Sequence, residues 1–354
     1  MSCDSLAEAL GWGHERVLVI SDEEIGLQAV VAIHSTVLGP ALGGLRHWRY
    51  ERGLVDAVED ALRLSRAMTL KASAAGLDLG GGKAVMLDDG NPELRDRRLE
   101  RFAQELELLG GAYITAEDVG TTTEDMDFLA AHTRHVVGRT ARSGIGGDPS
   151  PDTARTVLHA IQAALSVLDG TDDLDGTVVG ILGLGKVGGA LALSLVEQGA
   201  TVVAYDPAVR ALDGVELVDS PAALLERELD VLAPCALGGL IDEERAGQLR
   251  CRVVCGAANN PLTGVDVATA LAARGVLYVP DFLANCGGLV RADGERRQVS
   301  GEEVERNLDE AAARTREILD EAVALGELPL AVAERHASSR IEARQRREQH
   351  ALGG

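Results

Sequence analysis

A glycine-spaced segment in the second half of the chain has the residue types that bind phosphate. Gly183, Gly185 and Gly188 follow the apolar run at 177–182 and open a helix-like run. At this spacing the first glycine permits a tight turn, the second lets the backbone approach a pyrophosphate, and the third lets helix and strand pack closely. The helix N-terminus offers unpaired N–H groups and a positive dipole end to phosphate oxygens. The segment therefore predicts a dinucleotide-binding turn.

An acid follows this turn at the place where a dinucleotide needs one. A second apolar run, at 201–205, ends at Asp206, which lies 18 residues after Gly188. A carboxylate there can accept hydrogen bonds from both hydroxyls of an adenosine ribose, and it would repel the 2′-phosphate of NADP. The pattern favours NAD, although the positive charge of Arg210 nearby opposes this preference.

The chain holds three lysines, and two of them lie near glycines in its first half. Lys83 directly follows Gly80–Gly82, and Lys71 ends a helix-like run. A desolvated lysine, or one beside another cation, loses its proton more easily. One of the pair can bind a substrate carboxylate while the other assists proton transfer at the adjacent carbon. Each could also be a surface lysine; at Lys83 the three glycines favour a loop that wraps a small ligand.

Further polar residues come at the ends of strand-like segments. Asp118 ends one such segment before a glycine turn, which suits either a general base or a turn acid. Asn259 and Asn285 follow two more strand-like segments in the second half. Because ligands bind at the carboxyl ends of parallel strands, these amides could hold ribose hydroxyls or a nicotinamide amide, or could serve their turns alone.

Apolar spacing outlines the elements that must position these side chains. We expect strands at 17–20, 28–34, 84–87, 113–115, 231–232, 252–255 and 276–279, helices at 54–69, 95–109, 152–168 and 301–325, and a glycine-rich loop at 39–44. A Gly- and Pro-rich segment at 143–151 marks a domain boundary.

This pattern predicts an α/β fold of two domains with a cleft between them. Residues 1–148, joined by a C-terminal helix at about 329–354, would form a substrate-binding and catalytic domain. Residues 149–328 would form a Rossmann-type, doubly wound dinucleotide-binding domain.

Composition excludes several other classes of protein. The chain has 354 residues, of which 46% are hydrophobic and 25% charged, enough for two globular cores. A formal net charge of −22 disfavours nucleic acid and anionic membranes as partners. No apolar run is long enough to span a bilayer, and the start lacks a secretory signal. The five cysteines form no CxxC pair, so we expect no metal site and a cytoplasmic location.

Taken together, these motifs resemble the glutamate/leucine/phenylalanine/valine dehydrogenase family, most closely its leucine and valine branch. The matching segments run in one order along nearly the whole chain, at 38–44, 68–71, 76–85, 115–121, 149–151, 183–188, 233–239, 256–260 and 285–288. The resemblance implies NAD-dependent, reversible oxidative deamination of an L-amino acid to a 2-oxo acid and ammonia, carried out by a homo-oligomer.

The resemblance also implies a role for each matched residue. Lys71 would bind the substrate carboxylate, Lys83 would activate water and stabilise the carbinolamine, and Asp118 would carry protons to and from the amino group. The substrate would lie against Gly43 and Gly44, with its side chain in a pocket formed by Leu42, Met68 and Ala116. The cofactor would be held by Thr153, Gly183, Gly185, Lys186, Val187, Gly188, Asp206, Cys235, Ala236, Ala257, Asn259 and Asn285.

The choice of substrate depends on this pocket. Leu42 should narrow it and favour leucine, valine or isoleucine over phenylalanine, although one methylene is worth only about 1–3 kcal/mol of discrimination. The chain departs from the family's pattern at His47, Asp148, Cys286 and the polar segment 291–297. Two alternatives stay open: a dehydrogenase for phenylalanine or another larger amino acid, and a catalytically silent NAD-binding regulator. The presence of both lysines and Asp118 argues against the regulator.

Overall fold

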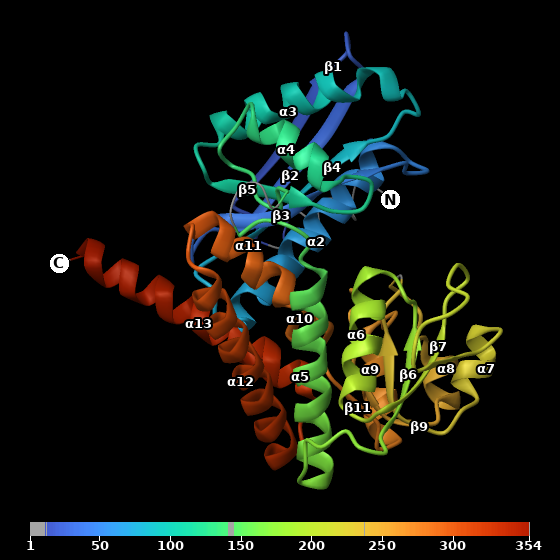
Figure 1. The fold of residues 1–354 in the computed structure, drawn as a ribbon. Helices are drawn as coiled ribbons and strands as arrows, with labels where there is room; N and C mark the ends of the chain where they lie inside the picture. The colour runs from blue at the N-terminus through green and yellow to red at the C-terminus, as the bar shows by residue number, and fades with distance from the viewer. Residues whose placement is uncertain (1–10, 12, 141–144, 237, 354) are drawn as a thin grey trace. The chain divides into compact units, whose positions relative to one another are not determined.

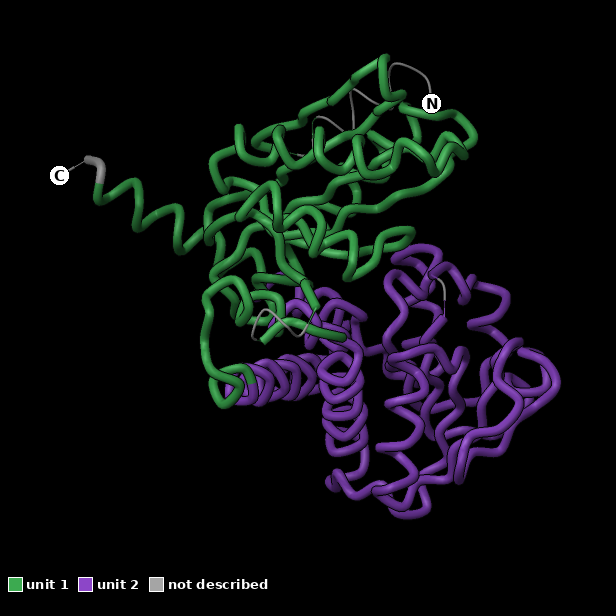
Figure 2. Tube along the Cα trace, turned by 45° about the horizontal axis from the view of Figure 1, so that its top comes forward, with its two compact units in different colours: residues 1–148, 291–304, 337–354 green, residues 149–290, 305–336 purple. Residues whose placement is uncertain are grey.

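The computed structural model describes residues 11, 13–140, 145–236 and 238–353. The chain forms two compact units, which Figure 2 colours separately. Unit 1 comprises residues 1–148, 291–304 and 337–354, and unit 2 comprises residues 149–290 and 305–336. The expected two-domain α/β fold with a doubly wound parallel sheet is confirmed.

The units differ from the expected domains in two late segments. Residues 291–304 group with unit 1, because the buried Glu295 carboxylate accepts hydrogen bonds from the Gly138 N–H (2.7 Å) and from Arg139 Nε (2.7 Å). The C-terminal helix joins unit 1 only from Ala337 onward, where the Ala337 carbonyl accepts a hydrogen bond from Ser73 Oγ (2.8 Å). Its first residues, up to 336, belong to unit 2.

Unit 1 is a five-stranded sheet with helices on both faces (Figure 1). Its strands, in the order β1-β2-β4-β3-β5, are β1 (Arg16–Asp22), β2 (Leu27–Ser35), β4 (Gly80–Leu87), β3 (Ala41–Trp48) and β5 (Tyr113–Glu117). Strands β3, β4 and β5 are parallel, whereas β1 pairs antiparallel with β2, and β2 with β4. The helices are α2 (Leu54–Ala74), η1 (Pro92–Leu94), α3 (Arg95–Leu108) and α4 (Thr123–Ala130).

Alternation along the strands separates two apolar layers in this unit. Ala29, Val31 and Ile33 of β2 pack with residues of α3 and α4, while Val30 and Ala32 pack with α2. Successive strand side chains point to opposite faces, so one strand serves both layers. Lys83 of β4 has the strand parity of Val85, which packs with α2.

Two glycine-rich segments that the sequence predicts as loops are strands in the structure. Ala41–Gly44 begins β3, and Gly80–Gly82 begins β4. A Cβ added at Gly81 would lie 2.1 Å from the Thr69 backbone nitrogen of α2, and one at Gly82 would lie 2.5 Å from the Tyr113 ring. These glycines allow neighbouring elements to approach, so the expectation that residues 80–82 wrap a ligand is wrong.

Unit 2 is a six-stranded parallel sheet in the order β11-β10-β9-β6-β7-β8. The strands are β6 (Val178–Leu182), β7 (Thr201–Tyr205), β8 (Val215–Leu217), β9 (Leu229–Pro234), β10 (Cys251–Val254) and β11 (Leu277–Tyr278). The helices are α5 (Ser150–Asp169), α6 (Lys186–Glu197), α7 (Pro221–Leu225), α8 (Glu243–Gln248), α9 (Val265–Ala273) and α10 (Asp281–Ala284). α5 and α6 cover one face, and α7, α8 and α9 the other.

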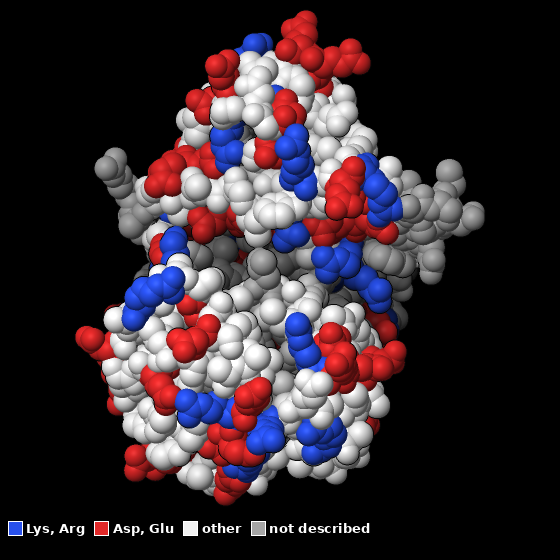
Figure 3. All heavy atoms as spheres, turned by 90° about the vertical axis from the view of Figure 1, so that its right-hand side faces the viewer, with Lys and Arg blue, Asp and Glu red and all other residues white. Residues whose placement is uncertain are grey.

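Three helices complete the chain, α11 (Gly287–Arg297), α12 (Gly301–Leu325) and α13 (Pro329–Gly353). Within the described residues, no helix combines the length and the apolar character that crossing a bilayer requires. On the face that Figure 3 shows, Lys and Arg side chains lie interspersed with Asp and Glu rather than gathered in one basic patch.

Candidate active site

Lys83 lies in the middle of β4 and is almost completely buried, with 6% of its surface exposed. Its ammonium group forms an ion pair with the carboxylate of Asp118, which directly follows β5. Burial lowers the pKa of Lys83 well below its usual range, and the positive charge of Arg46 lowers it further. Lys71 on α2 acts in the same direction. The site thus combines a buried lysine with a carboxylate that forms an ion pair with it.

Asp118 is held in a turn that is tied to the neighbouring strand. Its backbone N–H donates to Thr121 Oγ1 (2.9 Å), and the Thr121 hydroxyl donates to the Leu45 carbonyl of β3 (2.8 Å). A Cβ added at Gly44 would lie 2.7 Å from the Asp118 Cβ. Gly44 therefore lets the carboxylate lie directly against β3, where any larger residue would displace it.

The other predicted residues of unit 1 lie on the strands and helix around this pair. Leu42 is buried and lies opposite Gly81 in the pairing of β3 with β4, while Ala116 lies opposite Gly44 in the pairing of β3 with β5. Met68 and Lys71 are partly buried on α2, which runs past them to Ala74. The carbonyl of Gly43 accepts a hydrogen bond from the Tyr113 hydroxyl (2.5 Å).

A charged cluster beside this pair was missed by sequence reasoning. Asp60 of α2 accepts hydrogen bonds from Arg46 Nη1 (2.7 Å), the Tyr50 hydroxyl (2.6 Å) and Arg63 Nη2 (2.8 Å). Arg46 Nη2 also lies 3.7 Å from Asp118 Oδ1. The available signal was an acid between Ala57 and Ala61, which both lie on the buried face of α2, but nothing in the sequence identifies its partners.

The glycine turn of unit 2 joins β6 to α6, and its three glycines meet different surroundings. Gly183 has a positive φ of 100°, and a Cβ there would lie 2.9 Å from Ala236. A Cβ at Gly188 would lie 2.0 Å from the Gly183 carbonyl and 3.1 Å from the Cys235 Cβ. By contrast, a Cβ at Gly185 would meet no atom of the described residues within 4 Å, and its φ of −64° suits any residue. Packing therefore explains the first and third glycines only.

The surroundings of this turn carry hydrogen-bonding groups. Gly185 caps α6 without a side-chain hydrogen bond, and Lys186 and Val187 form the first turn of that helix. Asp206 accepts the N–H groups of Leu184 (2.8 Å) and Ala208 (2.8 Å), and these hydrogen bonds lower the pKa of its carboxyl. Asp206 is thus held, ionised, beside the turn.

A second polar group of unit 2 centres on Asn285, of which 3% is exposed. Its Nδ2 donates to the Ala257 carbonyl (3.0 Å) and to Asn259 Oδ1 (2.9 Å). Its Oδ1 is buried and has no hydrogen-bond partner among the described residues. Thr153 of α5 lies near the start of α11, since a Cβ at Gly288 would lie 3.0 Å from its hydroxyl. Burial raises the pKa of the Cys235 thiol to about 11, which keeps it protonated.

The departures from the family's pattern have structural partners. His47 Nδ1 lies 2.9 Å from Arg95 Nη1, and burial together with that cation lowers the pKa of His47. In the polar segment 291–297, the buried Asp293 accepts hydrogen bonds from Arg296 (2.6 Å), and Glu295 pairs with Arg139. Cys286 is buried.

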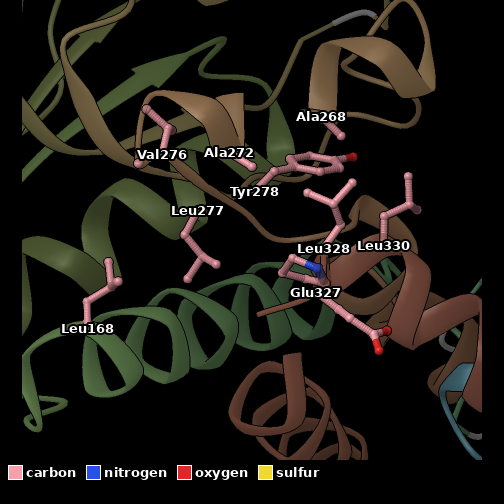
Figure 4. A pocket seen from close by; sticks show the side chains of 11 residues that line it. Leu168, Ala268, Ala272, Val276, Leu277, Tyr278, Glu327, Leu328 and Leu330 are labelled. Atoms are coloured by element: carbon pink, nitrogen blue, oxygen red, sulfur yellow. The ribbon is translucent and has the colours of Figure 1, made fainter. Parts of the chain in front are cut away.

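An apolar pocket in unit 2 lies apart from these groups (Figure 4). It is lined by Leu168, Ala268, Ala272, Gly275, Val276, Leu277, Tyr278, Glu327, Leu328, Pro329 and Leu330. Leu168 lies in the last turn of α5 and Val276 precedes β11, so the pocket lies toward the amino ends of the strands. Ligands of parallel α/β sheets bind at the opposite edge.

Two family models match the chain. Residues 14–135 match "Glu/Leu/Phe/Val dehydrogenase, dimerisation domain", and residues 205–345 match "Glutamate/Leucine/Phenylalanine/Valine dehydrogenase".

Individual relatives match most of the chain. A valine dehydrogenase of Streptomyces virginiae is 41% identical over 93% of this chain and 94% of its own length, and a leucine dehydrogenase of Bacillus subtilis is 38% identical over 94% and 92%. The crystal structure of L-tryptophan dehydrogenase from Nostoc punctiforme matches with a TM-score of 0.82 and 32% identity, over 96% of this chain and 99% of that one. The chain therefore belongs to the glutamate/leucine/phenylalanine/valine dehydrogenase family, on its leucine and valine branch, and is an oxidoreductase of the amino acid dehydrogenase class.

Proposed function

We propose that this protein catalyses the NAD-dependent, reversible oxidative deamination of a branched-chain L-amino acid to its 2-oxo acid and ammonia. The observation that carries the proposal is the buried pair of Lys83 and Asp118, with Lys71 close enough to lower the pKa of Lys83. A buried lysine with a lowered pKa can be neutral near physiological pH, as a catalytic base must be.

Each group of unit 1 then has a separate task. The Lys71 ammonium binds the substrate carboxylate, and Asp118 accepts a proton from the substrate amino group. After oxidation at Cα, neutral Lys83 takes a proton from water as the C–O bond forms at the imine carbon. Protonated Lys83 stabilises the resulting carbinolamine and then releases its proton to solvent. Asp118 returns a proton to the nitrogen, and as the C–N bond breaks and ammonia leaves, neutral Lys83 takes the hydroxyl proton and the C=O bond of the 2-oxo acid forms.

Unit 2 fits a nicotinamide dinucleotide. Gly185 lacks a Cβ where no described residue requires that, as expected for a backbone that a pyrophosphate approaches. Asp206 is ionised and beside the turn, which suits ribose hydroxyls and favours NAD over NADP. The buried Oδ1 of Asn285, which accepts no hydrogen bond from the described residues, suits a donor such as a carboxamide. Bound NAD would supply the hydride acceptor for the substrate Cα. The remaining proposed cofactor contacts are Thr153, Gly183, Lys186, Val187, Gly188, Cys235, Ala236, Ala257 and Asn259.

Leucine, valine and isoleucine are the proposed substrates, because buried Leu42, at the pocket position that the family resemblance gives it, would leave less room for a larger side chain. A larger amino acid is the second candidate, since the structural neighbour from Nostoc punctiforme is a tryptophan dehydrogenase. We further propose that the protein is a homo-oligomer, which the description of the model matching residues 14–135 as a dimerisation domain supports. Sedimentation at several protein concentrations tests this.

The direct test follows NADH absorbance with NAD and one L-amino acid at a time. We expect kcat/KM to be highest for leucine, valine or isoleucine, and lower for phenylalanine, tryptophan and glutamate. A preference for phenylalanine or tryptophan would establish the second candidate instead. NAD binding without NADH formation from any amino acid would contradict the proposed reaction and indicate a silent regulator.

A further inference from the structure

One carboxylate on α2 organises the cations around the Lys83–Asp118 pair. Asp60 is largely buried and accepts three hydrogen bonds, from Arg46, Tyr50 and Arg63. Burial by itself would raise the pKa of Asp60, but the Tyr50 hydrogen bond and the charges of Arg46 and Arg63 outweigh it and lower that pKa. Asp60 is therefore an ionised, buried anion that the reaction steps above do not use.

Arg46 connects this anion to the reacting pair. Its Nη1 donates to Asp60 Oδ2 at 2.7 Å, while its Nη2 lies 3.7 Å from Asp118 Oδ1, beyond hydrogen-bonding distance. A guanidinium is planar and holds its donors in a fixed fork, so anchoring one side sets the place of the other. The Arg46 Nε is buried without a hydrogen-bond partner among the described residues. Arg46 is thus held by Asp60 even though one of its donors stays unsatisfied.

The loss of Asp60 would have two consequences. Arg46 would be free to close the gap to Asp118 and to compete with Lys83 for that carboxylate. In addition, the cluster would lose a negative charge that opposes the effect of Arg46, Lys71 and Arg63 on Lys83. The charged groups that act on Lys83 come from β3 (Arg46), the turn after β5 (Asp118) and α2 (Asp60, Arg63 and Lys71).

We propose that Asp60 is a positioning residue for catalysis: by anchoring Arg46 at a distance from Asp118, it keeps that carboxylate paired with Lys83. This inference rests on the proposed function, because it assigns Lys83 and Asp118 to amino acid deamination.

The test compares the pH profiles of kcat/KM for oxidative deamination, whose acid limb reports the loss of the Lys83 proton. In Asp60→Asn we expect kcat/KM to fall by about ten-fold or more and the acid limb to move to lower pH, because an anion near Lys83 is gone. In Arg46→Gln the limb should move to higher pH, because the cation that lowers the pKa of Lys83 most is gone. Asp60→Glu, which keeps the charge, should restore the position of the limb.

Glu59→Gln is the matched control, since it removes a carboxylate from the next position of α2, where Glu59 pairs with exposed Arg52. We expect its profile to match the wild type. A purely structural role of Asp60 would lower kcat/KM without moving the acid limb of the pH profile. The inference would be overturned if the acid limb did not move, or if it moved in the same direction in Asp60→Asn and Arg46→Gln. Arg46→Gln and Asp60→Glu keep the test decisive if Asp60→Asn does not fold. An inactive wild type would instead refute the proposed function.

Discussion

Replacement of Lys83 by methionine separates a loss of catalysis from a loss of stability. Methionine has a similar length and no charge, so Lys83→Met removes the proposed base while filling its space. A positioned acid–base group contributes about 10²–10⁴-fold to a rate. We therefore expect kcat to fall by about 10²–10⁴-fold. At about 1.36 kcal/mol per factor of ten, this is a loss of about 3–5 kcal/mol of transition-state stabilisation.

The fold should tolerate this change because of what surrounds Lys83. Lys83 is only 6% exposed and lies near the cations Arg46 and Lys71, so removal of its ammonium group relieves a desolvation cost. Asp118 keeps a hydrogen bond from the Val119 N–H (2.7 Å) and the nearby charge of Arg46, at 3.7 Å, so its carboxylate is not left alone. We expect the free energy of unfolding to change by less than about 2 kcal/mol.

Three measurements on Lys83→Met decide the matter: NADH formation with the preferred amino acid, NAD affinity by titration, and denaturant unfolding. We expect turnover to be lost while the NAD affinity and the free energy of unfolding stay nearly unchanged. Retention of activity within ten-fold would refute the role of Lys83 as the base. A large loss of NAD affinity would refute its assignment to the substrate side of the reaction.

Three further outcomes follow from the same structure. The folded state lowers the pKa of Lys83, so between that pKa and the unfolded value of about 10.4 the unfolded chain binds more protons than the folded one. The free energy of unfolding of the wild type should therefore increase relative to that of Lys83→Met as pH rises through this range. Denaturant unfolding at several pH values checks this, and a difference between the two proteins that does not change with pH would contradict it. Gly185→Ala should weaken NAD binding by about ten-fold or more with little effect on stability. Gly188→Ala should lower the free energy of unfolding by about 1–3 kcal/mol, because its Cβ would lie 2.0 Å from the Gly183 carbonyl. Equal effects of the two variants on the free energy of unfolding would contradict this. Leu42→Val should raise kcat/KM for phenylalanine relative to valine by about ten-fold, while the control Leu45→Val, a buried residue of the same strand that packs with α3 and α4, should leave that ratio unchanged.

Hydrophobic periodicity and turn residues predicted the elements of this fold whose signal lies in a short stretch of sequence. The Rossmann-type sheet, the glycine turn at 183–188 and the long helix at 301–325 follow from periodicity and turn chemistry, and the structure contains all three. The motif that ends at Asp118 likewise led to a side chain that pairs with Lys83.

The parts that sequence reasoning missed depend on partners distant in the chain. Gly80–Gly82 resembles a loop until Thr69 and Tyr113 are known to lie where Cβ atoms would be. Asp60 resembles an ordinary helix acid until Arg46 and Tyr50 are placed against it. Segment 291–304 continues from unit 2 along the chain, and contacts with residues distant in the sequence, such as the hydrogen bonds of Glu295 and Arg291, assign it to unit 1.

In the proposed reaction, Lys83 and Asp118 of unit 1 act on an amino acid while a dinucleotide bound by unit 2 takes the hydride. The most direct measurement uses L-valine or L-leucine labelled with deuterium at Cα and follows NADH, ammonia and the label together. We expect one ammonia for each NADH formed, with the deuterium recovered on the nicotinamide ring. NAD binding without ammonia release, or deuterium that appears only in water, would contradict it.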